Sequence, residues 1–425
     1  MNIKTDIVIV GTGVGGLFCA LNLPSNKEIL MVTKEGVEDS DSFLAQGGIC
    51  VLKNENDYDS YFEDTMRAGH YENNKESVDI MIRSSGEIIN DLISYGVEFE
   101  RSESGELLFT KEGAHSTPRI LFHEDITGRE ITSKLLEKVK KLKNVKIMEH
   151  FTMLDIIEQD NECRGIVGKH KNGVMTAIEA DYTVFASGGI GGLYEHSTNY
   201  RHLTGDALAV SLKHNIELLN IDYIQIHPTT LYSNKPGRRF LISESVRGEG
   251  AVLFNANMER FVDELQPRDV VAEAIKVQMK KDKKPYVWLS MKPIPKEQIM
   301  THFPNIHKHC LEEGYDVTKE CIPVVPSQHY FMGGIKVNKY SKTSMDRLYA
   351  VGETACNGVH GKNRLASNSL LESLVFAKRA AGNIKAAYTA SEKNSDIDLR
   401  QYKNCDKNYK KAVLDAIEKE RASHE

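Results

Sequence analysis

The hexapeptide GTGVGG at residues 11–16 constrains the fold more tightly than any other part of the sequence. It follows DIVIV, whose last four residues are β-branched and apolar, and precedes a helical pattern that ends at a proline. In this context Gly11 permits a tight turn, Gly13 lets the backbone approach a pyrophosphate, and Gly16 lets helix and strand pack closely. With a second strand expected at residues 28–32, the pattern predicts a Rossmann-type βαβ unit that binds a dinucleotide.

Two further glycine-rich segments predict close contact with a ligand. Residues 42–49, SFLAQGGI, combine two consecutive glycines with an amide, and GGIGG at residues 188–192 interrupts another buried strand. Both segments indicate backbone that lies against a flat ring system. The acidic residue that commonly ends the second strand and binds a ribose is absent, because Thr33 and Lys34 stand there instead.

The chain length of 425 residues predicts more than one domain. Apolar periodicity indicates helices at residues 74–94, 126–142 and 372–388, a strand-turn-strand at 95–109, and strands at 145–147, 151–158, 163–169, 174–180 and 347–351. Residues 220–330 differ in character, with few expected strands and many polar side chains, and are interpreted as an inserted domain. We therefore expect a first domain at residues 1–219 that resumes at 331–390, and a charged tail at 391–425 that forms an exposed helix or is partly disordered.

Composition excludes several classes of partner. The net charge of −6 gives no general attraction to nucleic acid, and no apolar run is long enough to cross a bilayer. The seven cysteines are odd in number, scattered and never spaced C-x-x-C. This pattern argues against a disulfide framework or a zinc site, and it favours a reducing cytoplasm.

Chemistry-bearing side chains concentrate in the predicted inserted domain and just after it. These candidates are His227, Ser243, Glu244, Arg247, Arg268, His329 and Arg364. Each has an ordinary structural alternative: a histidine can be a satisfied core residue, Arg247 can pair with Glu249, and Arg268 beside Asp269 can cap a helix. Together, two histidines and several arginines predict a pocket for a small molecule with two carboxylates, and no metal site is expected.

At this point the motifs can be compared with a known family. The strings AQGGI, DITGRE, ASGGIGGLY, TGDALA, HPTTL, RGEGA, PRDVVA and NRLASNSLLE occur in this order between residues 6 and 381. The sequence thereby resembles the flavoprotein subunits of the succinate dehydrogenase and fumarate reductase family, and within it the branch that oxidises L-aspartate. The resemblance implies an α/β, Rossmann-like FAD-binding domain with an inserted α+β capping domain and a short C-terminal helical segment.

The resemblance also implies how FAD would be held. Membrane-attached dehydrogenases of the family commonly carry a flavin-linked histidine before A-Q-G-G, where this chain has residues 40–43, SDSF, so non-covalent binding is expected. The expected cofactor residues are Gly11, Thr12, Gly13, Val14, Gly15, Gly16, Lys34, Asp41, Ser42, Phe43, Leu44, Ala45, Gln46, Gly47, Gly48, Asp206, Glu353, Ser369 and Leu370.

For the substrate, the resemblance implies that Glu112 pairs with the α-ammonium of aspartate, which succinate lacks. His227, Ser243, His329 and Arg364 would hold the two carboxylates, Glu244 and Arg247 would support them, and Arg268 would donate or accept the proton when fumarate is reduced. Without the resemblance, Glu112 could equally be a surface glutamate in a loop. Ser243 stands where this branch often has threonine, a change that keeps the hydroxyl.

The implied reaction is oxidation of L-aspartate to iminoaspartate, with electrons passed to O2, giving H2O2, or to fumarate, giving succinate. It would supply a quinolinate synthase in the first step of NAD biosynthesis. The alternatives are a soluble fumarate reductase or succinate dehydrogenase flavoprotein, a flavin-binding module without activity and, least favoured, a nicotinamide dehydrogenase. Many relatives continue into a three-helix C-terminal domain, of which at most the first helix is expected here.

Overall fold

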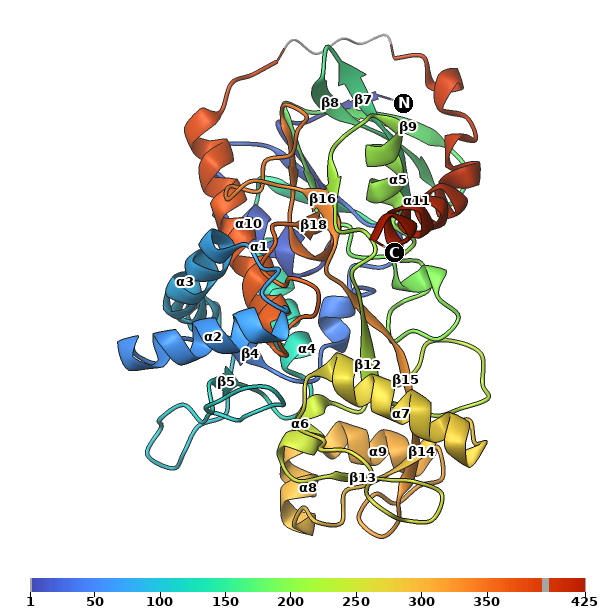
Figure 1. Cartoon of the computed structure of the whole chain (residues 1–425). Coiled ribbons are helices and arrows are strands. Elements are labelled where there is room, and N and C mark those ends of the chain that lie inside the picture. Colours follow the sequence, from blue (N-terminus) through green and yellow to red (C-terminus); the bar gives the residue numbers. More distant parts are fainter. Residues whose placement is uncertain (1, 392–396, 425) are drawn as a thin grey trace.

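The centre of the molecule is a five-stranded, all-parallel sheet with the strand order β17-β10-β2-β3-β6. The computed structural model describes residues 2–391 and 397–424 (Figure 1). The strands of this sheet are β2 (Ile7–Val10), β3 (Ile29–Val32), β6 (Val145–Met148), β10 (Tyr182–Phe185) and β17 (Leu348–Ala350). The glycine-rich turn joins β2 to helix α1 (Val14–Asn22), so the predicted Rossmann-like unit is confirmed.

Both faces of the parallel sheet are covered, which explains why its neighbouring strands β2 and β3 are apolar at every position. Ile7 and Ile9 of β2 point to one side, where α1, α4 (Thr127–Val139) and α10 (Asn368–Ala387) pack, with α3 (Lys75–Ser94) outside them. Val8 and Val10 point to the other side, toward a second sheet of order β1-β9-β8-β7. Its strands are β1 (Asn2–Lys4), β7 (Phe151–Gln159), β8 (Glu162–His170) and β9 (Met175–Glu179).

Most predicted elements of this region are found, with two differences. The helix α10 begins at Asn368, four residues before the predicted start, because Leu370 and Leu371 already belong to its buried face. The predicted strand-turn-strand at residues 95–109 is reduced to one bridge between Arg101 and Leu107 around a turn. A two-stranded sheet, β4 (Ile49–Cys50) and β5 (Ile120–Leu121), and helix α2 (Tyr58–Ala68) complete this side.

Residues 220–330 form the lobe at the lower end of Figure 1. The expectation of few strands is wrong, since this lobe is built on a four-stranded antiparallel sheet of order β12-β15-β14-β13. Its elements are β12 (Ile224–Leu231), α6 (Glu244–Gly248), β13 (Val252–Phe254), α7 (Arg268–Asp282), β14 (Val287–Ser290), α8 (Lys296–His302), α9 (Pro304–Glu312) and β15 (Ile322–Phe331). Prolines and buried polar residues within β12 and β15 hide the strand pattern, and the exact domain boundaries stay a prediction.

The charged tail contains helix α11 (Tyr409–His424), which packs on α5 (Asp206–Lys213) and buries Tyr409, Val413 and Ile417. The tail is therefore not a wholly exposed helix, and its residues 392–396 and 425 lie outside the described residues. A small sheet of β11 (Leu218–Leu219), β16 (Gly334–Lys336) and β18 (Ala355–Cys356) lies nearby. Across residues 2–391 and 397–424, no helix is both long and apolar enough to span a membrane.

Candidate active site

A cavity of about 440 Å³ begins at the turn after β2 and extends to the lobe of residues 220–330. The predicted cofactor residues other than Gly16 all line it. These are Gly11, Thr12, Gly13, Val14, Gly15, Lys34, Asp41, Ser42, Phe43, Leu44, Ala45, Gln46, Gly47, Gly48, Asp206, Glu353, Ser369 and Leu370. Gly16 does not line the cavity. It packs closely against the turn after β2, where a Cβ on Gly16 would lie 2.3 Å from the Gly11 carbonyl oxygen.

The turn after β2 fits the pyrophosphate of a dinucleotide. Gly11 has a φ of +117°, and a Cβ there would lie 2.0 Å from the carbonyl oxygen of Ala186, so no other residue fits without strain. Gly13 lines the cavity at the start of α1, where the Val14 N–H donates to Ser42 Oγ over 3.1 Å. Free backbone N–H groups at the N-terminus of a helix commonly bind an anion such as a phosphate.

Lys34 and Asp206 come together beside the end of β3. The ammonium of Lys34 lies 2.7 Å from the Asp206 carboxylate and donates to Thr204 Oγ1 over 3.0 Å. The sequence has no acidic residue directly after β3. The Asp206 carboxylate, at the start of α5, lies near that position instead. Both residues line the cavity.

Residues 41–46 present buried polar atoms that make no hydrogen bond among the described residues. Asp41 accepts from the Tyr200 N–H over 3.0 Å with Oδ1, while its Oδ2 and the Gln46 Oε1 are buried without a hydrogen bond. Burial raises the pKa of Asp41, and burial together with the Asp41 carboxylate raises the pKa of Glu353. Such unsatisfied groups around a cavity are those that a polar cofactor would engage.

The predicted substrate residues converge at the other end of the cavity. Glu112, Ser243, Arg268, His329 and Arg364 line it, whereas His227, Glu244 and Arg247 lie in the layer that supports them. The set comes from β12, α6, α7, β15 and two loops, so the fold brings together side chains spread over more than 250 positions.

Glu112 is not a surface residue, because only 1% of it is exposed. Its Oε1 accepts from Ser245 Oγ over 2.7 Å and its Oε2 from Ser367 Oγ over 2.6 Å. A Cβ on Gly47 would lie 2.6 Å from Oε1, so the carboxylate sits directly against the A-Q-G-G loop. Burial and the nearby Glu244 carboxylate raise the pKa of Glu112.

Arg268 lies between two polar partners at the first turn of α7. Its Nε donates to Glu244, and its Nη1 donates to Gln225 Oε1 over 2.9 Å. Burial opposes ionisation of Glu244, but Arg268 and Arg247 outweigh this effect and lower its pKa. Arg247 is fully buried and donates to the Glu264 carbonyl with Nη1; its Nη2 lies 3.7 Å from the Glu244 carboxylate, and neither Nε nor Nη2 makes a hydrogen bond among the described residues.

The two histidines lie edge to face, with ring centroids 5.0 Å apart. Burial, reinforced by Arg268, lowers the pKa of both His227 and His329 well below its ordinary value, so both imidazoles are neutral. His227 Nε2 and Arg364 Nε are buried without a partner among the described residues. Arg364 is fixed by Ser369, 2.7 Å from Nη1, and lies 4.4 Å from the Tyr330 ring centroid. Burial lowers the pKa of Arg364 to about 10, which still leaves it charged at neutral pH.

The structural alternatives for the arginine pairs are wrong. Glu249 contacts His302, 2.9 Å away, rather than Arg247. The Asp269 carboxylate lies 2.8 Å from His70, while the neighbouring Arg268 lines the cavity.

Sequence reasoning missed three polar residues of the site: Gln225, Ser245 and Ser367. Gln225 precedes His227 by two positions on β12, so the strand period could have placed both side chains on one face. No comparable signal marks the two serines.

The comparisons with known proteins identify the family to which the chain belongs. The family model described as FAD binding domain matches residues 6–370. The chain is 52% identical to the L-aspartate oxidase of Clostridium perfringens over 382 residues, which cover 90% of this chain and 87% of that protein. It is 49% identical to that of Clostridium acetobutylicum, with 94% and 93% covered, and 40% identical to the chloroplastic L-aspartate oxidase 2-b of Nicotiana tabacum, with 88% and 61% covered.

Among solved structures, the chain is similar to a variant of the quinol fumarate reductase of E. coli, with a TM-score of 0.86 and 28% identity. The match covers 99% of this chain and 74% of that chain. Sdh1 of Mycobacterium smegmatis in complex with UQ1 matches with a TM-score of 0.80 and 28% identity, over 96% of this chain and 72% of that chain.

Proposed function

The chain belongs to the L-aspartate oxidase family of proteins with an FAD binding domain, and on this premise we propose that it oxidises L-aspartate to iminoaspartate. FAD is the cofactor, and its isoalloxazine supplies the two-electron oxidation. Electrons pass on to O2, which gives H2O2, or to fumarate, which gives succinate.

The observation that carries the proposal is the buried carboxylate of Glu112. It lies between Ser245, Ser367 and the A-Q-G-G loop, in a cavity that the guanidinium groups of Arg268 and Arg364 also line. A substrate with only two carboxylates has no group to pair with such an anion. An amino dicarboxylate does, because its α-ammonium offers a charge-assisted hydrogen bond to Glu112.

The cationic groups would hold the substrate carboxylates. Arg364 would bind one carboxylate with its free Nε, supported by the neutral imidazoles of His227 and His329 and by the hydroxyl of Ser243. Neutral imidazoles can donate a hydrogen bond to an anion without the cost of burying further charge. Glu244 and Arg247 would orient Arg268, which would hold the proton that is exchanged with fumarate.

The cofactor would be bound without a covalent bond. The residues that replace the flavin-linked histidine, SDSF at positions 40–43, form the short helix η1 (Asp41–Leu44) after Ser40. The carboxylates of Asp41 and Glu353 and the backbone around Gly13 would bind polar parts of FAD.

The cellular setting is proposed from the cysteines and from the chemistry of the product. All seven cysteines are free thiols, as suits a reducing cytoplasm. Iminoaspartate is unstable in water, so functional coupling to a quinolinate synthase in the first step of NAD biosynthesis would use it directly.

The test is steady-state turnover of the FAD-loaded protein with L-aspartate. Peroxide should accumulate in air, and succinate should form from fumarate without air. The second candidate, a fumarate reductase or succinate dehydrogenase flavoprotein, is favoured by the likeness to quinol fumarate reductase. It would be supported if the protein reduced fumarate with an artificial donor but failed to oxidise aspartate.

A further inference from the structure

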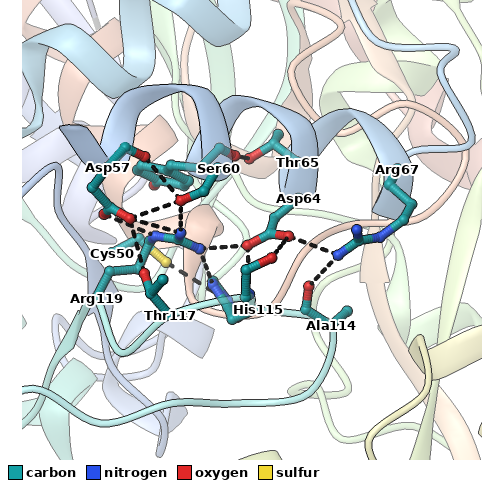
Figure 2. A network of polar contacts seen from close by, with 12 residues as sticks. Cys50, Asp57, Ser60, Asp64, Thr65, Arg67, Ala114, His115, Thr117 and Arg119 are labelled. Carbon is teal, nitrogen blue, oxygen red and sulfur yellow. Dashed lines mark hydrogen bonds and ion pairs between the residues drawn. The ribbon is translucent and has the colours of Figure 1, made fainter. Parts of the chain in front are cut away.

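The segment that carries Glu112, residues 111–118, belongs to no helix or strand, yet a buried ion network fixes it (Figure 2). Arg119 is fully buried and donates to both carboxylate oxygens of Asp57, over 3.1 and 3.0 Å. Its Nη1 donates to Asp64 Oδ2 over 2.7 Å. Ser116 donates to the same Asp64 from its backbone N–H, over 2.6 Å, so the segment is tied to α2.

His115 is the member of this network that reaches the opposite wall of the site. Its Nδ1 lies 3.1 Å from Arg119 Nη1, and its Nε2 lies 3.1 Å from the carbonyl oxygen of Ala366. A guanidinium can only donate, so Nδ1 must accept, and Nε2 must carry the hydrogen that is donated to Ala366. Burial and the charge of Arg119 lower the pKa of His115 to about 4, which keeps the imidazole neutral in this tautomer.

The two contacts close a ring around the Glu112 carboxylate. Ala366 precedes Ser367, whose Oγ donates to Glu112 Oε2 over 2.6 Å. Glu112 and His115 are three residues apart on one segment, and their partners are adjacent on the other. The imidazole therefore joins the segment that carries Glu112 to the segment that carries Ser367, directly beside the hydrogen bond between these two residues.

We propose that His115, oriented by Arg119, is a positioning residue that sets the specificity for an amino dicarboxylate by holding Glu112 against Ser367. This inference rests on the proposed function, since it assigns to Glu112 the reading of the substrate ammonium. Arg364 lies on the same segment as Ala366, but Ser369 and the Tyr330 ring fix its guanidinium independently. Binding of the substrate carboxylates by Arg364 therefore does not depend on His115.

The test compares His115→Leu with His115→Gln in the FAD-loaded protein. Leucine removes both contacts, whereas glutamine offers an acceptor to Arg119 and a donor to Ala366. We expect His115→Leu to raise KM for L-aspartate about tenfold, the loss of roughly one well-placed hydrogen bond. The Kd of succinate, measured by perturbation of the flavin spectrum, should stay within about twofold, and His115→Gln should recover most of the loss in KM.

Two further variants exclude a general loosening of the segment. Arg67 donates to Asp64 and to the Ala114 carbonyl at the exposed end of the network, without reaching Ala366. Arg67→Ala should leave KM for aspartate within about twofold of the wild type. In a Glu112→Gln background, His115→Leu should add less than about twofold, because both changes act on the same contact.

The outcomes separate this inference from the proposed function. If the wild type does not oxidise aspartate, the proposed function fails before any variant is compared. If the wild type is active but His115→Leu weakens aspartate and succinate equally, or its effect adds fully to that of Glu112→Gln, the positioning role is refuted. Should His115→Leu not retain FAD, His115→Asn takes its place, because its amide is too short to span both contacts.

Discussion

Replacement of Glu112 by glutamine tests the reading of the substrate ammonium. The side chain keeps its shape, and the hydroxyls of Ser245 and Ser367 can turn to accept from the amide, so the fold should tolerate the change. What is lost is the carboxylate charge toward the ammonium. A hydrogen bond to a charged group contributes about 1.5–3 kcal/mol, and each 1.4 kcal/mol corresponds to about a factor of ten.

We therefore expect kcat/KM for L-aspartate to fall roughly 10- to 150-fold in Glu112→Gln. The assay is the rate of flavin bleaching on mixing with aspartate without air, set against the rate of fumarate reduction by the reduced protein. Fumarate carries no ammonium, so its rate should change less than about threefold. Glu106→Gln, at an exposed glutamate of the preceding turn, is the control. Equal losses with both substrates would refute the reasoning.

Three further predictions concern the cofactor cavity and the lobe of residues 220–330. Gly11→Ala should destabilise the protein by about 3–5 kcal/mol, because its Cβ meets the Ala186 carbonyl; an unchanged melting temperature would contradict this. The Asp125 carboxylate accepts from two backbone N–H groups at the first turn of α9 and from the Asn305 side-chain amide. Asp125→Ala should therefore lower the free energy of unfolding by about 1–2 kcal/mol, measured by denaturant titration. An unchanged midpoint would show that Asp125 does not stabilise the start of this helix. Burial raises the pKa of Glu353, so the free energy of unfolding of the protein without FAD should fall as pH rises from the ordinary carboxyl range through the raised pKa. In melting scans at several pH values, Glu353→Gln should flatten this fall in melting temperature with pH. The same pH dependence in the variant and the wild type would refute the raised pKa of Glu353 as its cause.

Much of the first domain follows from local rules. Residues 7–10, IVIV, are apolar at every position because β2 is buried on both faces. Gly11 and Gly16 of the following turn are required because a Cβ at either position would meet a backbone carbonyl oxygen. The lobe of residues 220–330 was harder to predict. Its strands β12 and β15 carry prolines and turn polar side chains such as Gln225 and His227 inward, so the usual alternation is lost where the site needs polar groups.

The candidate site shows the same division. The arginines and histidines that the sequence singled out lie in or beside one part of the cavity, where charged side chains are rarely buried unless they are paired. Ser245 and Ser367 gave no signal, because a serine that fixes a carboxylate has the same local pattern as one in a turn. The network of Arg119 depends on segments more than 50 residues apart, and only the folded chain brings them together.

The most direct test of the account is the visible spectrum of the FAD-loaded protein without air, before and after addition of L-aspartate, with succinate as the comparison. The account predicts that aspartate bleaches the oxidised flavin band and that succinate does not. Bleaching by succinate but not by aspartate would contradict the amine-reading role of Glu112 and with it the proposed substrate.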